Sequence, residues 1–130
     1  MKRSQVQLTW AGFDAAIDLI SAQTTRRTCS GVYGPTSPGT VMAIALAHRL
    51  DVPRLTEPEN NMLLVDAWGW NRMLAEFSYN YEDVSVWVWV DTTPYFYNAV
   101  CHMEGVSCVS MPWQDAAHEC LEYFIPDFHD

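Results

Sequence analysis

Residues 31–50 read GVYGPTSPGTVMAIALAHRL, and this stretch decides the fold. The apolar run that ends at Tyr33 predicts a short strand over Cys29–Tyr33. The two glycines and two prolines of Gly34–Gly39 then predict a loop. Apolar residues recur from Val41 to Leu50 and predict a helix. A strand, a tight loop and a helix start together leave backbone N–H groups available for an anion.

A second segment repeats this pattern. Met62–Leu74 reads MLLVDAWGWNRML. Its continuous apolar run, Met62–Val65, is typical of a strand buried on both faces of a parallel sheet. Asp66 follows the strand, and a short helix is expected over Asn71–Phe77. Ligands of such sheets bind at the carboxyl ends of the strands, where both loops fall.

The remaining sequence predicts further alternation of helices and strands. Apolar spacing indicates a helix over residues 10–24, with Thr9 near its cap. We also expect strands over 84–90 and 106–111, an aromatic-rich loop over 92–98 and a helix over 115–123. The sequence therefore predicts one α/β domain over residues 1–130, with a mostly parallel sheet flanked by helices.

Composition narrows the class of partner. The chain is 49% hydrophobic and 18% charged, as expected of a globular domain. Its net charge of −9 argues against binding to a nucleic-acid backbone. No apolar run approaches the roughly 18 residues needed to span a membrane, and no signal-peptide block follows the start. We expect a cytoplasmic protein with no nucleic-acid or membrane partner.

The four cysteines are expected to be free thiols. They stand at positions 29, 101, 108 and 120 and form no CxxC pair. Cys101-His102 with Cys108, and His118-Glu119-Cys120, have spacings that match no structural zinc site. We therefore expect no bound metal.

Taken together, the motifs resemble those of the phosphoribosyltransferases, particularly their short bacterial purine-type branch, over about residues 8–114. Gly31–Leu50 aligns without a gap with a family stretch such as GVYGVPRGGLVPAVALAHRL. Met62–Leu74 takes the place of a strand that ends in two acids and is followed by a loop such as DTGRTL. Met111–Gln114 takes the place of an FPWE-like sequence. The resemblance implies the family's fold and a site for a purine and phosphoribosyl diphosphate, with magnesium if the chain is catalytic.

The departures from the family pattern fall in the two ligand loops. Ser37 and Pro38 replace an arginine and a glycine, and proline removes a backbone donor. Val65 replaces one of the two acids, and Gly69–Met73 replaces the phosphate cradle. Losing one such donor typically costs about 3–4 kcal/mol of transition-state stabilisation. The sequence therefore favours a nucleotide scaffold without cofactor or catalysis over an active transferase.

Several candidate residues have two interpretations. Asp66 either accepts from a ribose hydroxyl or caps the next helix. Trp70 either stacks on a base or covers a helix end or a dimer surface, and Arg72 either binds a phosphate or is a solvated residue at a helix start. The full candidate ligand site comprises Pro35, Thr36, Ser37, Gly39, Thr40, Asp66, Trp68, Gly69, Trp70, Asn71 and Arg72.

Three functions remain open from the sequence. The first is a non-catalytic nucleotide-binding protein that sequesters or senses a signalling nucleotide, for example as a viral anti-defence sponge. The second is an active purine phosphoribosyltransferase that uses Asp66 and magnesium. The third is a protein-interaction module with an exposed tryptophan patch. A homodimer is expected, with Trp10 or the cluster Tyr95–Tyr97 at its interface.

Overall fold

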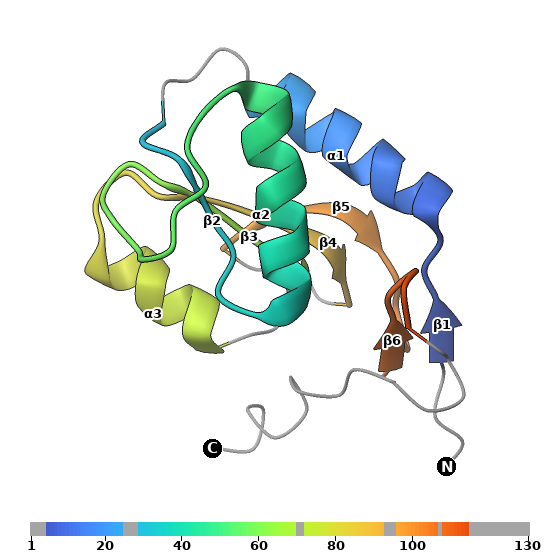
Figure 1. Ribbon diagram of the computed structural model, residues 1–130. Helices are drawn as coiled ribbons and strands as arrows, with labels where there is room; N and C mark the ends of the chain where they lie inside the picture. The colour runs from blue at the N-terminus through green and yellow to red at the C-terminus, as the bar shows by residue number, and fades with distance from the viewer. Residues whose placement is uncertain (1–4, 25–28, 70–71, 93–95, 107, 115–130) are drawn as a thin grey trace.

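The computed structural model describes residues 5–24, 29–69, 72–92, 96–106 and 108–114. Helices and strands alternate along most of this length (Figure 1). The elements in chain order are β1 (Gln5–Gln7), α1 (Trp10–Thr24), β2 (Val32–Tyr33), α2 (Ser37–Leu50), β3 (Leu63–Trp68), α3 (Arg72–Asn80), β4 (Ser85–Asp91), β5 (Asn98–His102) and β6 (Cys108–Ser110).

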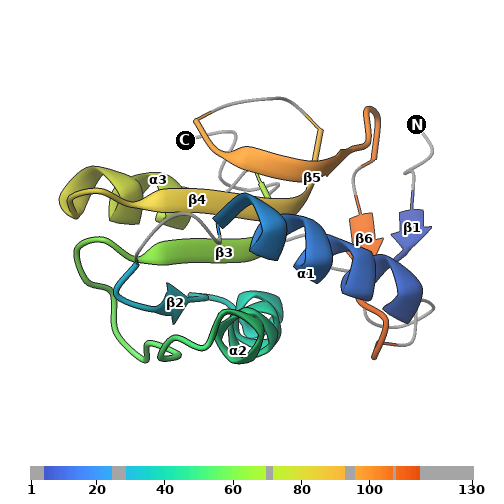
Figure 2. The same cartoon turned by 90° about the horizontal axis from the view of Figure 1, so that it is seen from above.

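The main sheet has four parallel strands in the order β2-β3-β4-β5. Its register pairs Asp66 of β3 with Val88 of β4, and Trp68 with Val90. A separate parallel ribbon pairs β1 with β6. The carboxyl ends of β4 and β5 point toward this ribbon in both views (Figures 1 and 2). The edge at which ligands bind in such sheets therefore lies beside the ribbon.

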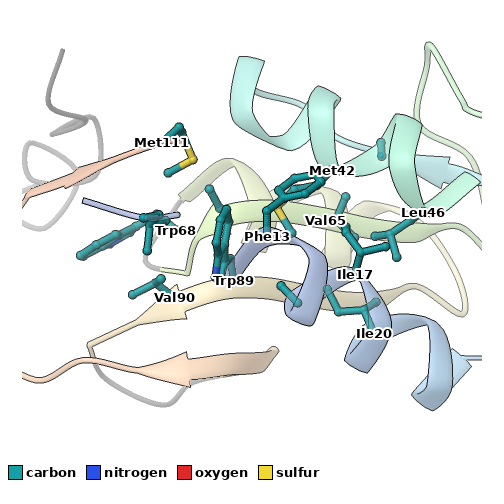
Figure 3. Close-up of a cluster of buried hydrophobic side chains, with 14 of the residues drawn as sticks. Phe13, Ile17, Ile20, Met42, Leu46, Val65, Trp68, Trp89, Val90 and Met111 are labelled. Atoms are coloured by element: carbon teal, nitrogen blue, oxygen red, sulfur yellow. The ribbon is translucent and has the colours of Figure 1, made fainter. Parts of the chain in front are cut away.

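Helices cover both faces of the main sheet. The larger buried cluster joins α1 and α2 to one face, and it contains Phe13, Ile17, Met42 and Leu46 with Val65 (Figure 3). The smaller cluster joins Leu74 and Phe77 of α3 to Leu64, Val86 and Val88 on the other face. Figure 2 shows α1 crossing in front of β3 and β4. Burial on both faces explains why β3 is apolar almost throughout.

The predicted α/β class and mostly parallel sheet are confirmed, with changes at element ends. β3 was expected to end at Val65, but it continues to Trp68 because Trp68 still pairs with β4. α2 was expected to begin near Val41, but it begins at Ser37 because Thr36 caps it. Proline in the first helical turn is compatible with this early start.

Two strands were not predicted, namely β1 and β5. Both are at the margin of a sheet, and β5 has exposed polar residues, Asn98 and His102, at its two ends. The helix predicted over 115–123 lies outside the described residues. Among the helices that are described, none is both long and apolar enough to cross a membrane.

Candidate functional site

The first candidate loop is capped by its own side chains. Thr36 is the N-cap of α2, and its hydroxyl accepts a hydrogen bond from the Gly39 amide at 3.1 Å. The Thr40 amide donates to the Thr36 carbonyl at 2.7 Å, and Pro38 has no N–H. Of the first four helical residues, Ser37 is thus the one whose amide has no partner among the described residues.

The same loop is closed tightly on itself. A Cβ atom on Gly34 would lie 1.9 Å from the carbonyl oxygen of Gly39, so backbone packs directly on backbone there. A Cβ on Gly39 would lie 2.9 Å from the carbonyl oxygen of Val65. The Thr40 hydroxyl donates to the Gly34 carbonyl at 3.1 Å. The loop is therefore a closed turn, and only its outer end, at Ser37, is exposed.

One hydrogen bond joins the two candidate loops. The Thr36 hydroxyl donates to Oδ1 of Asp66 at 2.6 Å, and the Ala67 amide donates to the same oxygen at 2.7 Å. Asp66 is fully buried. The sequence suggested a ribose hydroxyl or a helix cap as the partner of this carboxylate. In the structure the bond from Thr36 holds the first loop against β3, and the bond from Ala67 lies within β3 itself.

The second loop begins in the core. Trp68 is 1% exposed and belongs to the larger buried cluster, with Trp89 and Val90 (Figure 3). The Gly69 amide donates to the Val90 carbonyl at 2.9 Å. A Cβ on Gly69 would lie 2.6 Å from the Tyr97 hydroxyl oxygen, so the phenol covers this glycine.

The structure describes one of the three remaining candidates in this loop, Arg72. Arg72 is exposed at the first residue of α3, a position that leaves both interpretations of this residue open. Trp70 and Asn71 lie outside the described residues, and so does Tyr95 of the aromatic cluster. The structure thus brings Thr36 and Asp66 into contact and keeps Trp68 in the core.

Sequence reasoning missed a second polar pair at the same edge. Asp91 ends β4 and His102 ends β5, and the two residues are in register. Nδ1 of His102 lies 2.7 Å from Oδ1 of Asp91. The Asp91 side chain is 5% exposed, whereas that of His102 is 45% exposed. An acid directly after the run Val84–Val90 was the available signal, because Asp66 follows the apolar run Met62–Val65 in the same way.

The carboxylate of Asp91 also affects its neighbours. Burial, and then the charge of Asp91, raises the pKa of Tyr97 to about 12, so this phenol stays protonated at neutral pH. Burial and the same carboxylate raise the pKa of the Cys101 thiol. Across the described part of the chain, no group of three or more histidine, cysteine or acidic side chains is arranged to hold a metal ion.

Comparison with known proteins places the fold. No protein-family model matches this sequence, and no curated protein matches it significantly. A purine phosphoribosyltransferase from Pyrococcus horikoshii is similar in structure, with a TM-score of 0.68 and 16% identity over 85% of this chain and 95% of that one. A xanthine-guanine-hypoxanthine phosphoribosyltransferase from Helicobacter pylori has a TM-score of 0.64 and 9% identity over 86% and 93%.

A third similar structure holds a bound nucleotide. It is a hypothetical protein from Neisseria gonorrhoeae with bound ppGpp, with a TM-score of 0.59 and 13% identity over 88% of this chain and 92% of that one. At these identities the likeness concerns the fold alone. The chain has the α/β fold of the phosphoribosyltransferases.

Proposed function

We propose that this protein binds a nucleotide without converting it. The observation that carries the proposal is the placement of the two candidate loops side by side toward the carboxyl edge of the sheet, where a 2.6 Å hydrogen bond from Thr36 to Asp66 joins them. Ligands of open α/β sheets bind at this edge. The likeness to two purine phosphoribosyltransferases and to a protein with bound ppGpp adds support for a nucleotide-type ligand.

The closed first loop is the reason to propose binding without turnover. Transfer of a phosphoribosyl group requires donors preorganised around the departing diphosphate. Here the Gly39 and Thr40 amides donate within the loop, and Pro38 supplies none. Each lost donor would cost about 3–4 kcal/mol of transition-state stabilisation, so several losses together would leave little catalytic activity.

This chain also has only one of the two acidic residues that would position magnesium. The resemblance places two acids at the end of β3, and this chain has Val65 and Asp66 there. The carboxylate of Asp66 is fully buried and accepts a hydrogen bond from Thr36, so it is not exposed to a metal ion in solvent. The proposed activity therefore involves no metal.

A phosphate anchor is proposed at the exposed ends of the two loops. Ser37 is exposed at the start of α2, and Arg72 is exposed at the start of α3. Both positions lie at helix N-termini, where the helix dipole favours an anion. A protein that holds such a ligand unchanged would sequester or sense it, and a sponge for a signalling nucleotide is the concrete form of this proposal.

Titration calorimetry on the full chain tests the binding. The panel comprises GMP, AMP, ppGpp, ADP-ribose and a cyclic dinucleotide. We expect Arg72→Gln to weaken the bound nucleotide about tenfold, because a charge-assisted contact to phosphate is lost. Arg54→Gln is the matched control, since Arg54 is exposed and bridges to Val32 of β2. No heat from any member of the panel would refute the proposal and favour a protein-interaction module.

The transferase alternative has its own assay. The chain is incubated with phosphoribosyl diphosphate, magnesium and each of adenine, guanine, hypoxanthine and xanthine. We expect no release of diphosphate above the uncatalysed rate. Release that is abolished by Asp66→Ala would show a purine phosphoribosyltransferase instead.

We further propose that the protein is a homodimer. Trp10 is 54% exposed at the start of α1 and packs against Trp113, which is 39% exposed, with ring centroids 5.8 Å apart. Exposed aromatic pairs of this kind are enriched at interfaces. Light scattering at micromolar concentration should give twice the chain mass, and the mass of one chain would contradict the dimer.

A further inference from the structure

An apolar groove lies between the start of α1 and the strands β4 and β5, apart from the two candidate loops. Its volume is about 340 Å³, and none of its described walls carries a charged side chain. An apolar cavity of roughly 150 Å³ holds one benzene molecule, so this groove has room for about two ring-sized side chains. The walls used below are Gln7, Leu8, Gly12, Trp89, Val100 and Cys101.

The C-terminal end of the described chain lies beside this groove. Nε2 of the wall residue Gln7 donates to the carbonyl of Met111 at 2.8 Å. Trp113 packs against Phe13 with ring centroids 6.4 Å apart, and Phe13 packs against the wall residue Trp89 with centroids 5.6 Å apart. The chain therefore leaves the described part of the structure next to the groove.

The sequence that follows, residues 115–130, lies outside the described residues and is amphipathic in its first part. Ala117, Leu121 and Phe124 recur at helical spacing, which would place them on one face of a helix together with Cys120. Glutamates at the intervening positions would fall on the opposite face. A helix of this kind needs an apolar surface against which its apolar face can pack.

We infer that residues 117–124 form an amphipathic helix that packs into this groove, with Leu121 and Phe124 in the space between α1 and β5. The uncharged walls suit the apolar face, and the glutamates of the segment stay in water. The covalent link favours this occupant over a second copy, because a short tether gives an effective concentration on the order of millimolar. The inference does not depend on nucleotide binding.

The rate of thiol labelling at Cys101 tests this packing, because Cys101 is a half-buried wall of the groove. The other three cysteines are replaced by serine, and the thiol reagent DTNB is added to the folded full chain. We expect Leu121→Asp combined with Phe124→Asp to raise the rate about tenfold or more, since burial of these side chains would hold the segment in place. All variants are compared at one pH, because burial, and then the charge of Asp91, raises the pKa of this thiol.

Glu119→Gln combined with Glu122→Gln is the matched control. Both glutamates fall on the opposite face of the proposed helix, so this variant should label at the rate of the chain with the original segment. Circular dichroism shows whether each variant is folded. Hydrogen exchange on the unmodified chain is a second measurement that needs no variant. The amides of residues 117–124 should exchange about tenfold or more slowly than those of a free peptide of the same sequence.

Three results would overturn the inference. Equal labelling rates for the double aspartate variant and the glutamine control would show that this segment does not cover the groove. Unprotected amides over residues 117–124 would show the same, even if the double aspartate variant failed to fold. Labelling of Cys101 that becomes faster on dilution of the chain with the original segment would show that a second copy fills the groove instead.

Discussion

Replacing Thr36 by valine should destabilise the protein substantially, because one hydroxyl serves two partners. It accepts from the Gly39 amide as the N-cap of α2, and it donates to the buried carboxylate of Asp66 at 2.6 Å. Loss of an N-cap side chain costs about 1 kcal/mol. Loss of a hydrogen bond to a buried charged group costs about 1.5–3 kcal/mol. Since valine keeps nearly the same shape, the expected loss in the free energy of unfolding is about 3 kcal/mol.

Urea denaturation followed by tryptophan fluorescence measures this change. A loss of about 3 kcal/mol in a domain of this size corresponds to a fall in Tm of about 12 °C, with the urea m-value unchanged. Thr36→Ser retains the hydroxyl and should remain within about 0.5 kcal/mol of the original stability, since serine is an equally good N-cap. The reasoning is refuted if Thr36→Val is no less stable than the original protein, or if Thr36→Ser is as unstable as Thr36→Val.

Three further predictions concern single positions. Gly34→Ala should lower the free energy of unfolding by about 3 kcal/mol, because its Cβ would lie 1.9 Å from the Gly39 carbonyl oxygen. Urea denaturation measures this loss, and Gly12→Ala, whose Cβ would have contacts of 3.2 Å or more, is the control. Burial holds the pKa of Tyr97 at about 12 in the folded state, against 10 when unfolded, so stability should fall as the pH rises from 10 toward 12. Tyr97→Phe should reduce that fall, and an unchanged pH dependence would contradict it. Trp68→Ala should lower the free energy of unfolding by about 3–5 kcal/mol, because the indole is 1% exposed. A variant that keeps its stability but binds nucleotide more weakly would instead make Trp68 a ligand contact.

The central strands and the first helix were predictable because burial leaves a local trace in the sequence. Met62–Val65 is a continuous apolar run and Val84–Val90 is interrupted only by Ser85, and the structure places both in a sheet covered on its two faces. The helix over 10–24 follows from apolar residues at helical spacing, and α1 has those bounds. In each case the apolar pattern of one segment is sufficient to predict its secondary structure, because the segment packs against other apolar side chains of the core.

The edge strand and the end of the first loop were not predictable in this way. β5 has an exposed residue at each end and only partly buried residues between them, so its conformation depends on pairing with β4. The start of α2 depends on whether Thr36 caps it, which composition alone does not decide. Both features are set by contacts between segments, and a single sequence carries little signal for them.

The chemistry of the site shows the same limit more sharply. Thr36 and Asp66 both have groups that bind ribose or phosphate in other settings, and each was reasonable as a ligand residue when considered alone. They are thirty positions apart, and the 2.6 Å contact between them appears only in the fold. A hydroxyl and a carboxylate that satisfy each other have less to offer a ligand than the same two groups apart. The sequence therefore predicts that the two candidate loops lie near one edge of the sheet, but it does not predict the contact between them.

Under the proposed function, the distribution of charge along the edge bears on which part of a nucleotide would supply most of the affinity. Asp66 is buried within β3, and Asp91 is buried at the end of β4. The amides of Gly39 and Thr40 are used inside the first loop. Two carboxylates repel phosphate groups and attract N–H donors. An edge that has lost phosphate donors and carries buried acceptors is therefore better suited to grip a base than a diphosphate. This argues for recognition through the base end of the ligand, with Arg72 as a secondary anchor for phosphate.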